Sequence, residues 1–348
     1  MKIAVALSGG VDSAIAAYLL KQQNYELMGV TLKLEKSDSD KFCANVEAAK
    51  EVCQKLGIKH HVLDVSDKFK EKVIDYFVSE LEAGRTPNPC VPCNFWVKFG
   101  ELFDFARTEL KADKLATGHY AQIDAEKSVG SSLKSFPTQR YILKKARASN
   151  KDQTYFLHRL TQEQLKYLLF PLGTVESKEK VKQIAKEQGF PQKDVAESQD
   201  ICFSTPQVKA RPGKIIDTLG NKIGEHKGLP FYTIGQREGL GIAHKKPYFV
   251  LNKVIEENAI IVTDNKKDLF KKEITVSDVN IISDNYVPGD FSALVKLRST
   301  ASELSARIYL SKNRTAKITF SELALSPTPG QFAVFYKDNI CLGGGAID

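Results

Sequence analysis

The chain has 348 residues, 42% of them hydrophobic, which is enough for two or three domains with buried cores. No run approaches the ~20 consecutive apolar positions of a membrane span, so an integral membrane protein is excluded. Residues 3–7 form too short an apolar start for a signal peptide, and we expect a cytoplasmic protein with reduced cysteines. The net charge of +8 permits an anionic partner such as RNA without requiring one.

The first third of the chain alternates between strand-like and helix-like stretches. Strands are predicted at residues 3–7, 27–34, 61–65 and 114–117, and helices at residues 12–22, 41–56 and 67–83. Repeated alternation of strand and helix predicts an α/β fold, with a mostly parallel sheet covered by helices on both faces.

The rest of the chain has a different pattern. The segments in order are a surface hairpin or mobile loop at 123–140, helices at 161–169 and 178–188, a linker at 204–213, and short β-like runs with turns over 215–262. Short strands are then predicted at 274–276, 292–297, 305–310, 315–320 and 331–336, which is typical of a small β-barrel. We therefore expect three domains, at residues 1–204, 205–265 and 266–348.

The segment between the first strand and the first helix, Ser8-Gly9-Gly10-Val11-Asp12-Ser13, is suited to bind phosphate. Its glycines let the backbone approach a bound group, and the helix that follows offers free N–H groups. Asp12 is a candidate ligand for Mg²⁺ between phosphates. The segment is neither a Walker A loop nor a dinucleotide fingerprint. It matches the loop of the ATP pyrophosphatases, which cleave ATP to AMP and pyrophosphate.

Three cysteines lie in surroundings that suit reactive thiols. Cys90 and Cys93 belong to a proline-rich stretch that predicts a stiff loop just before a helix beginning near Asn94. Thiols at a helix N-terminus are acidified, so we expect a nucleophilic thiolate there. A single Cys-x-x-Cys pair is also compatible with zinc, iron–sulfur or redox chemistry. Cys202 has polar residues on both sides, which argues against a core thiol.

Taken together, the motifs resemble those of the tRNA-specific 2-thiouridylases, which replace the C2 oxygen of the wobble uridine of tRNA by sulfur. Matching segments are spread over nearly the whole chain, at 8–13, 86–94, 116–121, 151–157, 170–173, 198–203, 224–226, 232–237, 329–331 and 342–345. The resemblance implies an ATP-pyrophosphatase domain with the adenine-nucleotide α-hydrolase-like fold, a small central domain and a C-terminal β-barrel.

The resemblance also implies a mechanism. ATP and Mg²⁺ would be used to adenylate the uridine O2, Cys202 would receive a persulfide sulfur from a carrier protein or desulfurase, and Cys93 would be its partner thiol. The implied ATP-binding residues are Ala6, Leu7, Ser8, Gly9, Gly10, Val11, Asp12, Ser13, Leu32 and Gly118. The implied contacts to the target base and the tRNA are Asn88, Pro89, Cys90, His119, Lys151, Asp152, Gln153, Arg298, Ser299 and Gln331.

The chain departs from the family pattern in three places. Cys90 stands where some members have Asp, residues 203–212 form a shorter segment than usual, and Ser299 stands where an aromatic residue often follows the arginine. Because an Asp at the position of Cys90 is credited with proton transfer, that role stays open in this chain.

Three alternatives remain open. Cys90, Cys93 and Cys202 are chemically sufficient to hold an iron–sulfur cluster with one open iron site, which would carry sulfide to the same base. The chain could instead be an ATP-pyrophosphatase synthetase acting on a small molecule. A non-catalytic RNA-binding protein is the third alternative.

Overall fold

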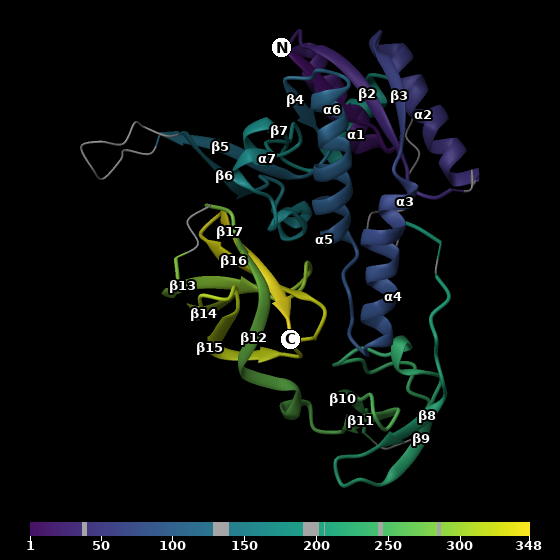
Figure 1. Ribbon diagram of the computed structural model, residues 1–348, viewed down its shortest axis with the longest axis vertical. Helices are drawn as coiled ribbons and strands as arrows, with labels where there is room; N and C mark the ends of the chain where they lie inside the picture. The colour runs from purple at the N-terminus through teal and green to yellow at the C-terminus, as the bar shows by residue number, and fades with distance from the viewer. Residues whose placement is uncertain (37–39, 128–138, 191–201, 205, 243–245, 284–286) are drawn as a thin grey trace.

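The computed structural model describes residues 1–36, 40–127, 139–190, 202–204, 206–242, 246–283 and 287–348 (Figure 1). The N-terminal sheet and its helices form the upper part of the view. The C-terminal barrel lies at the lower left and a small central sheet at the lower right (Figure 1). Among the described residues, no helix combines the length and the apolarity that crossing a bilayer demands.

The N-terminal part is built on a parallel sheet, as predicted. Within the described residues its strand order is β3-β2-β1-β4-β7, and every neighbouring pair is parallel. The strands are β1 (Lys2–Ala6), β2 (Glu26–Lys33), β3 (Lys59–Asp64), β4 (Lys114–Ala116) and β7 (Leu168–Leu169). The prediction of a helix over 161–169 was wrong at its end, because Leu168 and Leu169 pair with Leu115 and Ala116 instead.

Helices cover both faces of this sheet, as predicted. One face packs against α1 (Val11–Gln22), α2 (Asp40–Leu56) and α8 (Lys178–Glu187), and alternate β1 side chains such as Ile3 and Val5 point to it. The other face, with Ala4, packs against the helical run formed by α5 (Cys90–Pro92), the π-helix η2 (Cys93–Glu101) and α6 (Leu102–Thr108). The predicted helix 67–83 is a run of α3 (Ser66–Phe69), the π-helix η1 (Lys70–Ile74) and α4 (Asp75–Glu82).

A β-hairpin connects the N-terminal part to the C-terminal barrel. The hairpin consists of β5 (Ala121–Lys127) and β6 (Gln139–Lys145), which is one of the two forms expected for residues 123–140, and residues 128–138 lie outside the described residues. The barrel strands are β12 (Phe270–Ile281), β13 (Gly289–Lys296), β14 (Leu304–Leu310), β15 (Ala316–Leu325), β16 (Phe332–Lys337) and β17 (Ile340–Ile347). Pairing of β12 with β17 closes the barrel, and β17 also pairs with β6 through Cys341 and Leu143.

The central part is a small sheet with strand order β10-β11-β8-β9. Its strands are β8 (Gly213–Ile216), β9 (Lys222–His226), β10 (Phe249–Val254) and β11 (Ala259–Thr263). The remaining helical elements are α7 (Gln162–Tyr167) and the 3₁₀ turns η3 (Ser149–Lys151), η4 (Thr154–Leu157), η5 (Leu229–Phe231) and η6 (Lys266–Leu269). Thr161 caps α7 through a reciprocal capping box with Gln164, which explains why this helix begins where it does.

His158 is a buried histidine at the contact between the N-terminal part and the barrel. Its Nδ1 lies 2.8 Å from the carbonyl oxygen of Tyr155, and its ring packs on Phe332 with the centroids 5.0 Å apart. Its Nε2 has no hydrogen-bond partner among the residues that the structure describes. Burial is the main cause that lowers the pKa of His158 to about 3.

This low pKa makes the stability of the fold sensitive to acid. Above pH 6.5 the imidazole is neutral in both the folded and the unfolded chain. Below pH 6.5 the unfolded chain binds a proton, whereas the folded chain does not accept one until the pH approaches 3. We expect His158 alone to lower the free energy of unfolding by about 1.4 kcal/mol per pH unit as the pH falls below 6.5. Urea unfolding of the wild type and of His158→Gln at pH 7.5, 6.5 and 5.5 measures this slope. An equal slope in both proteins would contradict the assignment.

Candidate active site

The predicted phosphate loop lies where the strand order of the sheet reverses, between β1 and β4. The chain continues from β1 to β2 on one side, whereas β4 pairs with β1 on the other side. In open α/β sheets, the crevice outside the carboxyl ends of two such strands is where ligands bind. A Cβ atom added to Gly118, just after β4, would lie 2.9 Å from the carbonyl carbon of Asp12 and from the nitrogen of Ser13. The ends of β1 and β4 therefore meet at the start of α1.

The loop is already held in shape by its own hydrogen bonds. The Ser13 hydroxyl accepts a hydrogen bond from the Ser8 backbone nitrogen at 3.2 Å and donates one to the Gly10 carbonyl at 2.9 Å. Gly9 has a φ of +77°, and a Cβ there would lie 2.8 Å from the Cα of Asn45. Gly10 provides no side-chain cap for α1. The first N–H groups of α1 therefore stay available to an anion.

Asp12 binds two groups that the sequence analysis did not single out. Its Oδ1 accepts a hydrogen bond from the Tyr120 hydroxyl at 2.8 Å and from Lys178 Nζ at 2.5 Å. Both contacts are made to the same oxygen, which leaves Oδ2 to coordinate Mg²⁺. Among the described residues no second carboxylate groups with Asp12 into a metal site, so a magnesium ion here would take its other ligands from phosphates and water. Lys178 is the first residue of α8, and only 13% of its side chain is exposed. It is one of 50 basic residues, and no motif in the sequence marks it.

The structure corrects the prediction for Cys90 and Cys93. The helix begins at Cys90 and not near Asn94, so both cysteines lie inside the first turns of the helical run. Burial raises the pKa of Cys93 to about 12 and also raises the pKa of Cys90. The positive charge of Lys98 opposes this effect without overcoming it. Both thiols are therefore protonated at neutral pH, and the acidified thiolate expected from the sequence is not found.

Cys93 is buried because an apolar cluster surrounds it. The cluster contains Val65, Phe69, Phe77, Val97 and Phe203. Phe203 packs edge-on against both Phe69 and Phe77, with centroids 5.6 Å apart in each pair. Phe203, the residue after the exposed Cys202, therefore packs in the same cluster as Cys93. The other predicted motif positions, 198–201, lie outside the described residues.

The three candidate thiols share one region of the molecule. The charge of Cys202 contributes to the raised pKa of both Cys90 and Cys93. However, nowhere in the described part of the chain are three or more His, Cys, Asp or Glu side chains grouped so that they could hold a metal ion. The structure therefore shows no preformed iron–sulfur site at these cysteines.

Lys98 connects this thiol region with the nucleotide loop. Its charge acts on Cys90 and Cys93, and it also lowers the pKa of His119, next to Gly118. His119 packs against the rings of Phe99 and Phe170 at centroid distances of 5.7 and 5.8 Å, and these two rings also contact each other at 6.0 Å. Its Nδ1 is 2.7 Å from the Thr117 hydroxyl, and burial holds its pKa well below the usual range. His119 is therefore a neutral, buried side chain at the end of β4.

Two further residues predicted to contact tRNA are held by bonds within the protein. Asp152 accepts hydrogen bonds from the Ala146 nitrogen at 3.0 Å and the Thr154 hydroxyl at 2.6 Å, and burial raises its pKa. Gln153 Oε1 accepts a hydrogen bond from the Tyr120 nitrogen at 2.9 Å. This contact positions Tyr120, whose hydroxyl donates a hydrogen bond to Asp12. Lys151 and Ser299 are partly exposed.

Gln331 and Arg298 lie where all three parts of the molecule meet. The contact centres on Thr86, at the start of the predicted base-binding loop. Gln331 Nε2 donates a hydrogen bond to the Thr86 carbonyl at 2.8 Å, and the Thr86 nitrogen donates one to the Pro329 carbonyl at 2.8 Å. The Thr86 hydroxyl is 3.3 Å from that of Thr233 in the central part. Arg298 donates to the Thr328 hydroxyl at 2.6 Å and to the carbonyl of Ile234 at 3.3 Å.

The loop that follows Thr86 is also held locally. Asn88 Oδ1 accepts a hydrogen bond from the Cys90 nitrogen at 3.1 Å, a local turn that leads into the helical run at Cys90, whose N-cap is Pro89. Pro89 is the residue between them. The predicted base-binding residues are therefore fixed from two directions, by the barrel and by the start of the helix.

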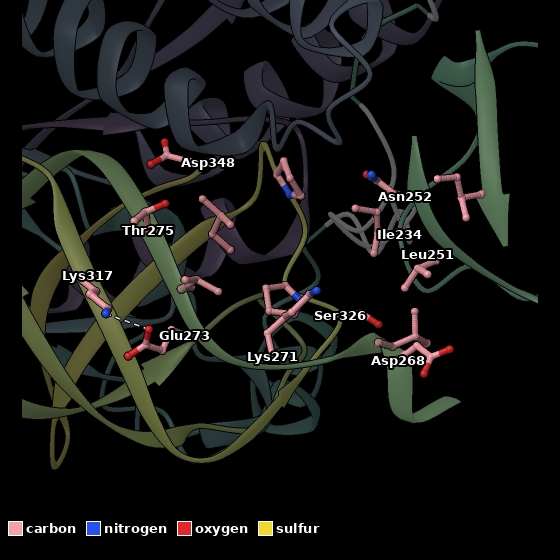
Figure 2. Close-up of a pocket in the computed structure, with 16 residues that line it drawn as sticks. Ile234, Leu251, Asn252, Asp268, Lys271, Glu273, Thr275, Lys317, Ser326 and Asp348 are labelled. Carbon is pink, nitrogen blue, oxygen red and sulfur yellow. Dashed lines mark ion pairs between the residues drawn. The ribbon is translucent and has the colours of Figure 1, made fainter. Parts of the chain in front are cut away.

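A cleft of about 710 Å³ lies between the central sheet and the barrel, and Ile234 and Pro329, which bond to Arg298 and Thr86, are among its lining residues. Asn252 and Leu251 line it on one side, and Lys271, Glu273 and Lys317 on the other (Figure 2). Lys317 and Glu273 form an ion pair at 2.8 Å across neighbouring strands. None of the candidate cysteines or phosphate-loop residues lines this cleft, which instead borders the contact of the three parts at Thr86 and Arg298.

Comparisons with known proteins identify relatives over the full chain. The families described as "tRNA methyl transferase HUP domain", "tRNA methyl transferase PRC-barrel domain" and "Aminomethyltransferase beta-barrel domain" match residues 1–206, 203–264 and 271–347. The chain is 42% identical over 365 residues to the tRNA-specific 2-thiouridylase MnmA of Clostridioides difficile (strain 630), covering 100% of this chain and 98% of the relative. It is 40% identical over 366 residues to the MnmA of Clostridium perfringens (strain 13 / Type A), with the same coverage.

A comparison of structures gives weaker matches. The U34-tRNA thiolase NcsA from Methanococcus maripaludis with its [4Fe-4S] cluster is 19% identical, and the match covers 55% of this chain and 57% of that one with a TM-score of 0.35. This similarity is too low to inform the chemistry of the present site.

Proposed function

The chain belongs to the tRNA-specific 2-thiouridylase family, and on that premise we propose that it is a tRNA sulfurtransferase that replaces the wobble-uridine O2 by sulfur at the expense of ATP. The family assignment agrees with the motif resemblance seen in the sequence. The observation that best supports the activity is the phosphate loop at the reversal of the strand order, where the uncapped start of α1 lies beside the Asp12 carboxylate that holds Lys178 and Tyr120.

The first step is activation of the base. The uridine O2 attacks the α-phosphorus of ATP, the O2–phosphorus bond forms, pyrophosphate leaves, and the N3 proton is lost. The N–H groups of α1 and the exposed Ser8 hydroxyl bind the leaving phosphates, while the Ser13 hydroxyl holds the loop in shape. Asp12 would hold a magnesium ion, which would neutralise phosphate charge. Lys178 moves from Asp12 to the pyrophosphate and stabilises the charge that develops there.

The second step transfers sulfur. The terminal sulfur of a Cys202 persulfide attacks C2, and the C2–O bond breaks as AMP leaves. Cys93 then attacks Sγ of Cys202, the persulfide S–S bond breaks, and the sulfur remains on C2. A Cys93–Cys202 disulfide results, and the Cys93 thiol proton replaces the one lost from N3. A thiol reductant supplies the two electrons that reduce the disulfide to the two free thiols. The buried, protonated Cys93 is suited to this role because it stays inert until the adduct forms.

We also propose the domain boundaries 1–204, 205–265 and 266–348 and a cytoplasmic location. The first domain catalyses the reaction, while the central domain and the barrel bind the tRNA. A persulfide-bearing carrier or desulfurase is the partner that the second step requires.

An anaerobic assay with metal-stripped full-length protein tests the proposal. It contains unmodified tRNA, ATP, Mg²⁺, and a cysteine desulfurase with cysteine as the persulfide source. Mass spectrometry of the digested nucleosides is expected to show 2-thiouridine. The measurement distinguishes it from a methylated uridine, because the two products differ in mass. Product only after iron–sulfur reconstitution would favour a cluster held by Cys90, Cys93 and Cys202. Pyrophosphate release that needs no tRNA would favour a small-molecule synthetase, and tRNA binding without ATP turnover a non-catalytic protein.

A further inference from the structure

Tyr120 is a buried tyrosine whose hydroxyl bonds to the phosphate loop. Only 3% of its surface is exposed, and it belongs to the apolar cluster that contains Ala16 and Ala17 of α1. A buried phenol requires a hydrogen-bond partner, and this hydroxyl donates to Asp12 Oδ1 at 2.8 Å. A phenylalanine ring would fill the same apolar surroundings. The hydroxyl therefore has a role beyond the packing of the core.

The backbone that carries this side chain is held by Gln153. Tyr120 lies between β4 and β5, where its N–H donates to Gln153 Oε1 at 2.9 Å and its carbonyl accepts from the Gln153 N–H at 2.9 Å. One residue thus satisfies both backbone polar groups of Tyr120. Gln153 is the N-cap of η4 and lies between two anchored residues, because Asp152 bonds to the Ala146 nitrogen and Thr154 is fully buried. The hydroxyl therefore approaches Asp12 from a fixed direction.

The Tyr120 hydroxyl and Lys178 share one oxygen of the Asp12 carboxylate. Lys178 Nζ lies 2.5 Å from Oδ1, the same atom that accepts the hydrogen bond from Tyr120. An ammonium group carries three donors, so a carboxylate that could rotate would present either oxygen to it. A second donor fixed on Oδ1 opposes this rotation. It keeps Oδ2, to which no described residue bonds, available for a metal ion.

We propose that Tyr120 is a positioning residue for ATP activation, which holds the Asp12 carboxylate in the orientation that binds the Mg²⁺ of bound ATP. Groups that orient a metal-binding carboxylate contribute about 10- to 100-fold to metal affinity or activity. This inference rests on the proposed function, because it takes ATP as the nucleotide. It requires neither tRNA nor sulfur, so nucleotide binding alone can test it.

Titration calorimetry with α,β-methylene-ATP, which cannot release pyrophosphate, tests the proposal on the full-length protein. The Kd is measured in Mg²⁺ and in EDTA. In Mg²⁺, Tyr120→Phe is expected to bind about 10- to 100-fold more weakly than wild type. In EDTA the two proteins should agree within a few-fold, because the aromatic ring and the phosphate loop are unchanged. Tyr155→Phe is the matched control: it also loses a buried hydroxyl, which bonds to Phe332 of the barrel, and should bind as wild type does.

A double-mutant cycle tests whether Tyr120 acts through Asp12. In an Asp12→Asn background, Tyr120→Phe is expected to cause no further loss of affinity in Mg²⁺, because the carboxylate that it positions is already gone. Additive losses would overturn the proposal. So would an equal loss in EDTA, which would mean that Tyr120 supports only the shape of the loop, or wild-type affinity of natively folded Tyr120→Phe in Mg²⁺.

Failure of the proposed function has a different signature. If the wild-type protein forms no 2-thiouridine, yet Tyr120→Phe loses affinity only in Mg²⁺, the proposed function fails and the positioning role stands. If 2-thiouridine forms but the affinity of Tyr120→Phe is unchanged, the positioning role fails and the proposed function stands.

Discussion

Replacement of Cys202 by Ser is expected to abolish 2-thiouridine formation while ATP-dependent pyrophosphate release continues. A serine hydroxyl cannot carry a persulfide, so the activated base forms but finds no sulfur. We expect thiolation to fall by on the order of 10³-fold or more, which is typical for loss of a covalent nucleophile. Pyrophosphate release with tRNA present should stay within a few-fold of wild type, because Cys202 is exposed and supplies no group to the adenylation step. Both quantities are measured on the same preparation.

Cys43→Ser is the matched control, because Cys43 is another exposed thiol and lies on α2. It is expected to keep both activities. Loss of adenylation together with thiolation in Cys202→Ser would mean that Cys202 supports the structure of the site. Equal loss of thiolation in the Ser variants of Cys90, Cys93 and Cys202, each accompanied by loss of bound iron, would favour the cluster.

Replacement of Asp12 by Asn is expected to stop the reaction one step earlier. The neutral amide cannot hold magnesium or pair with Lys178, so pyrophosphate release should fall by about 10²- to 10³-fold. Lys178→Met is expected to lower it by about 10-fold or more, because the leaving pyrophosphate loses one cation. Lys180→Met is the control, since Lys180 lies on the same helix and bonds only to the exposed Gln183 within the described residues. Pyrophosphate release at the wild-type rate in Asp12→Asn would show that Asp12 does not hold the metal ion.

The parts of the fold that local patterns determine were predicted well. The strand before Ser8, the helix after it and the strand ending at Ala116 are all present, because apolar runs, caps and glycine turns act over a few residues. The parallel sheet was predicted from the alternation of strands and helices, whereas its strand order, with β4 beside β1, was not. Even the small barrel was predicted from evenly spaced short strands.

The properties that depend on distant residues were not predicted. Lys178 reaches Asp12 from 166 residues further along the chain, and no local pattern reports this contact. The start of a helix suggests an acidic Cys93, but side chains such as Phe69 and Phe203 bury it, and desolvation outweighs the helix terminus. Gln331 likewise gains its partner Thr86 only through the docking of the barrel. Tertiary packing decides these cases.

Strand β17 gives the chain an order of assembly during synthesis. Its eight residues close the barrel against β12 and also cover the edge of β6 in the hairpin. They are synthesised after the other five barrel strands, so the barrel stays open and the β6 edge unpaired until these residues have been made. Unpaired edges are the usual starting points of aggregation. A nascent or truncated chain lacking residues 340–347 therefore exposes the edges of β12, β16 and β6 at once, so the loss of one strand leaves three others without a partner.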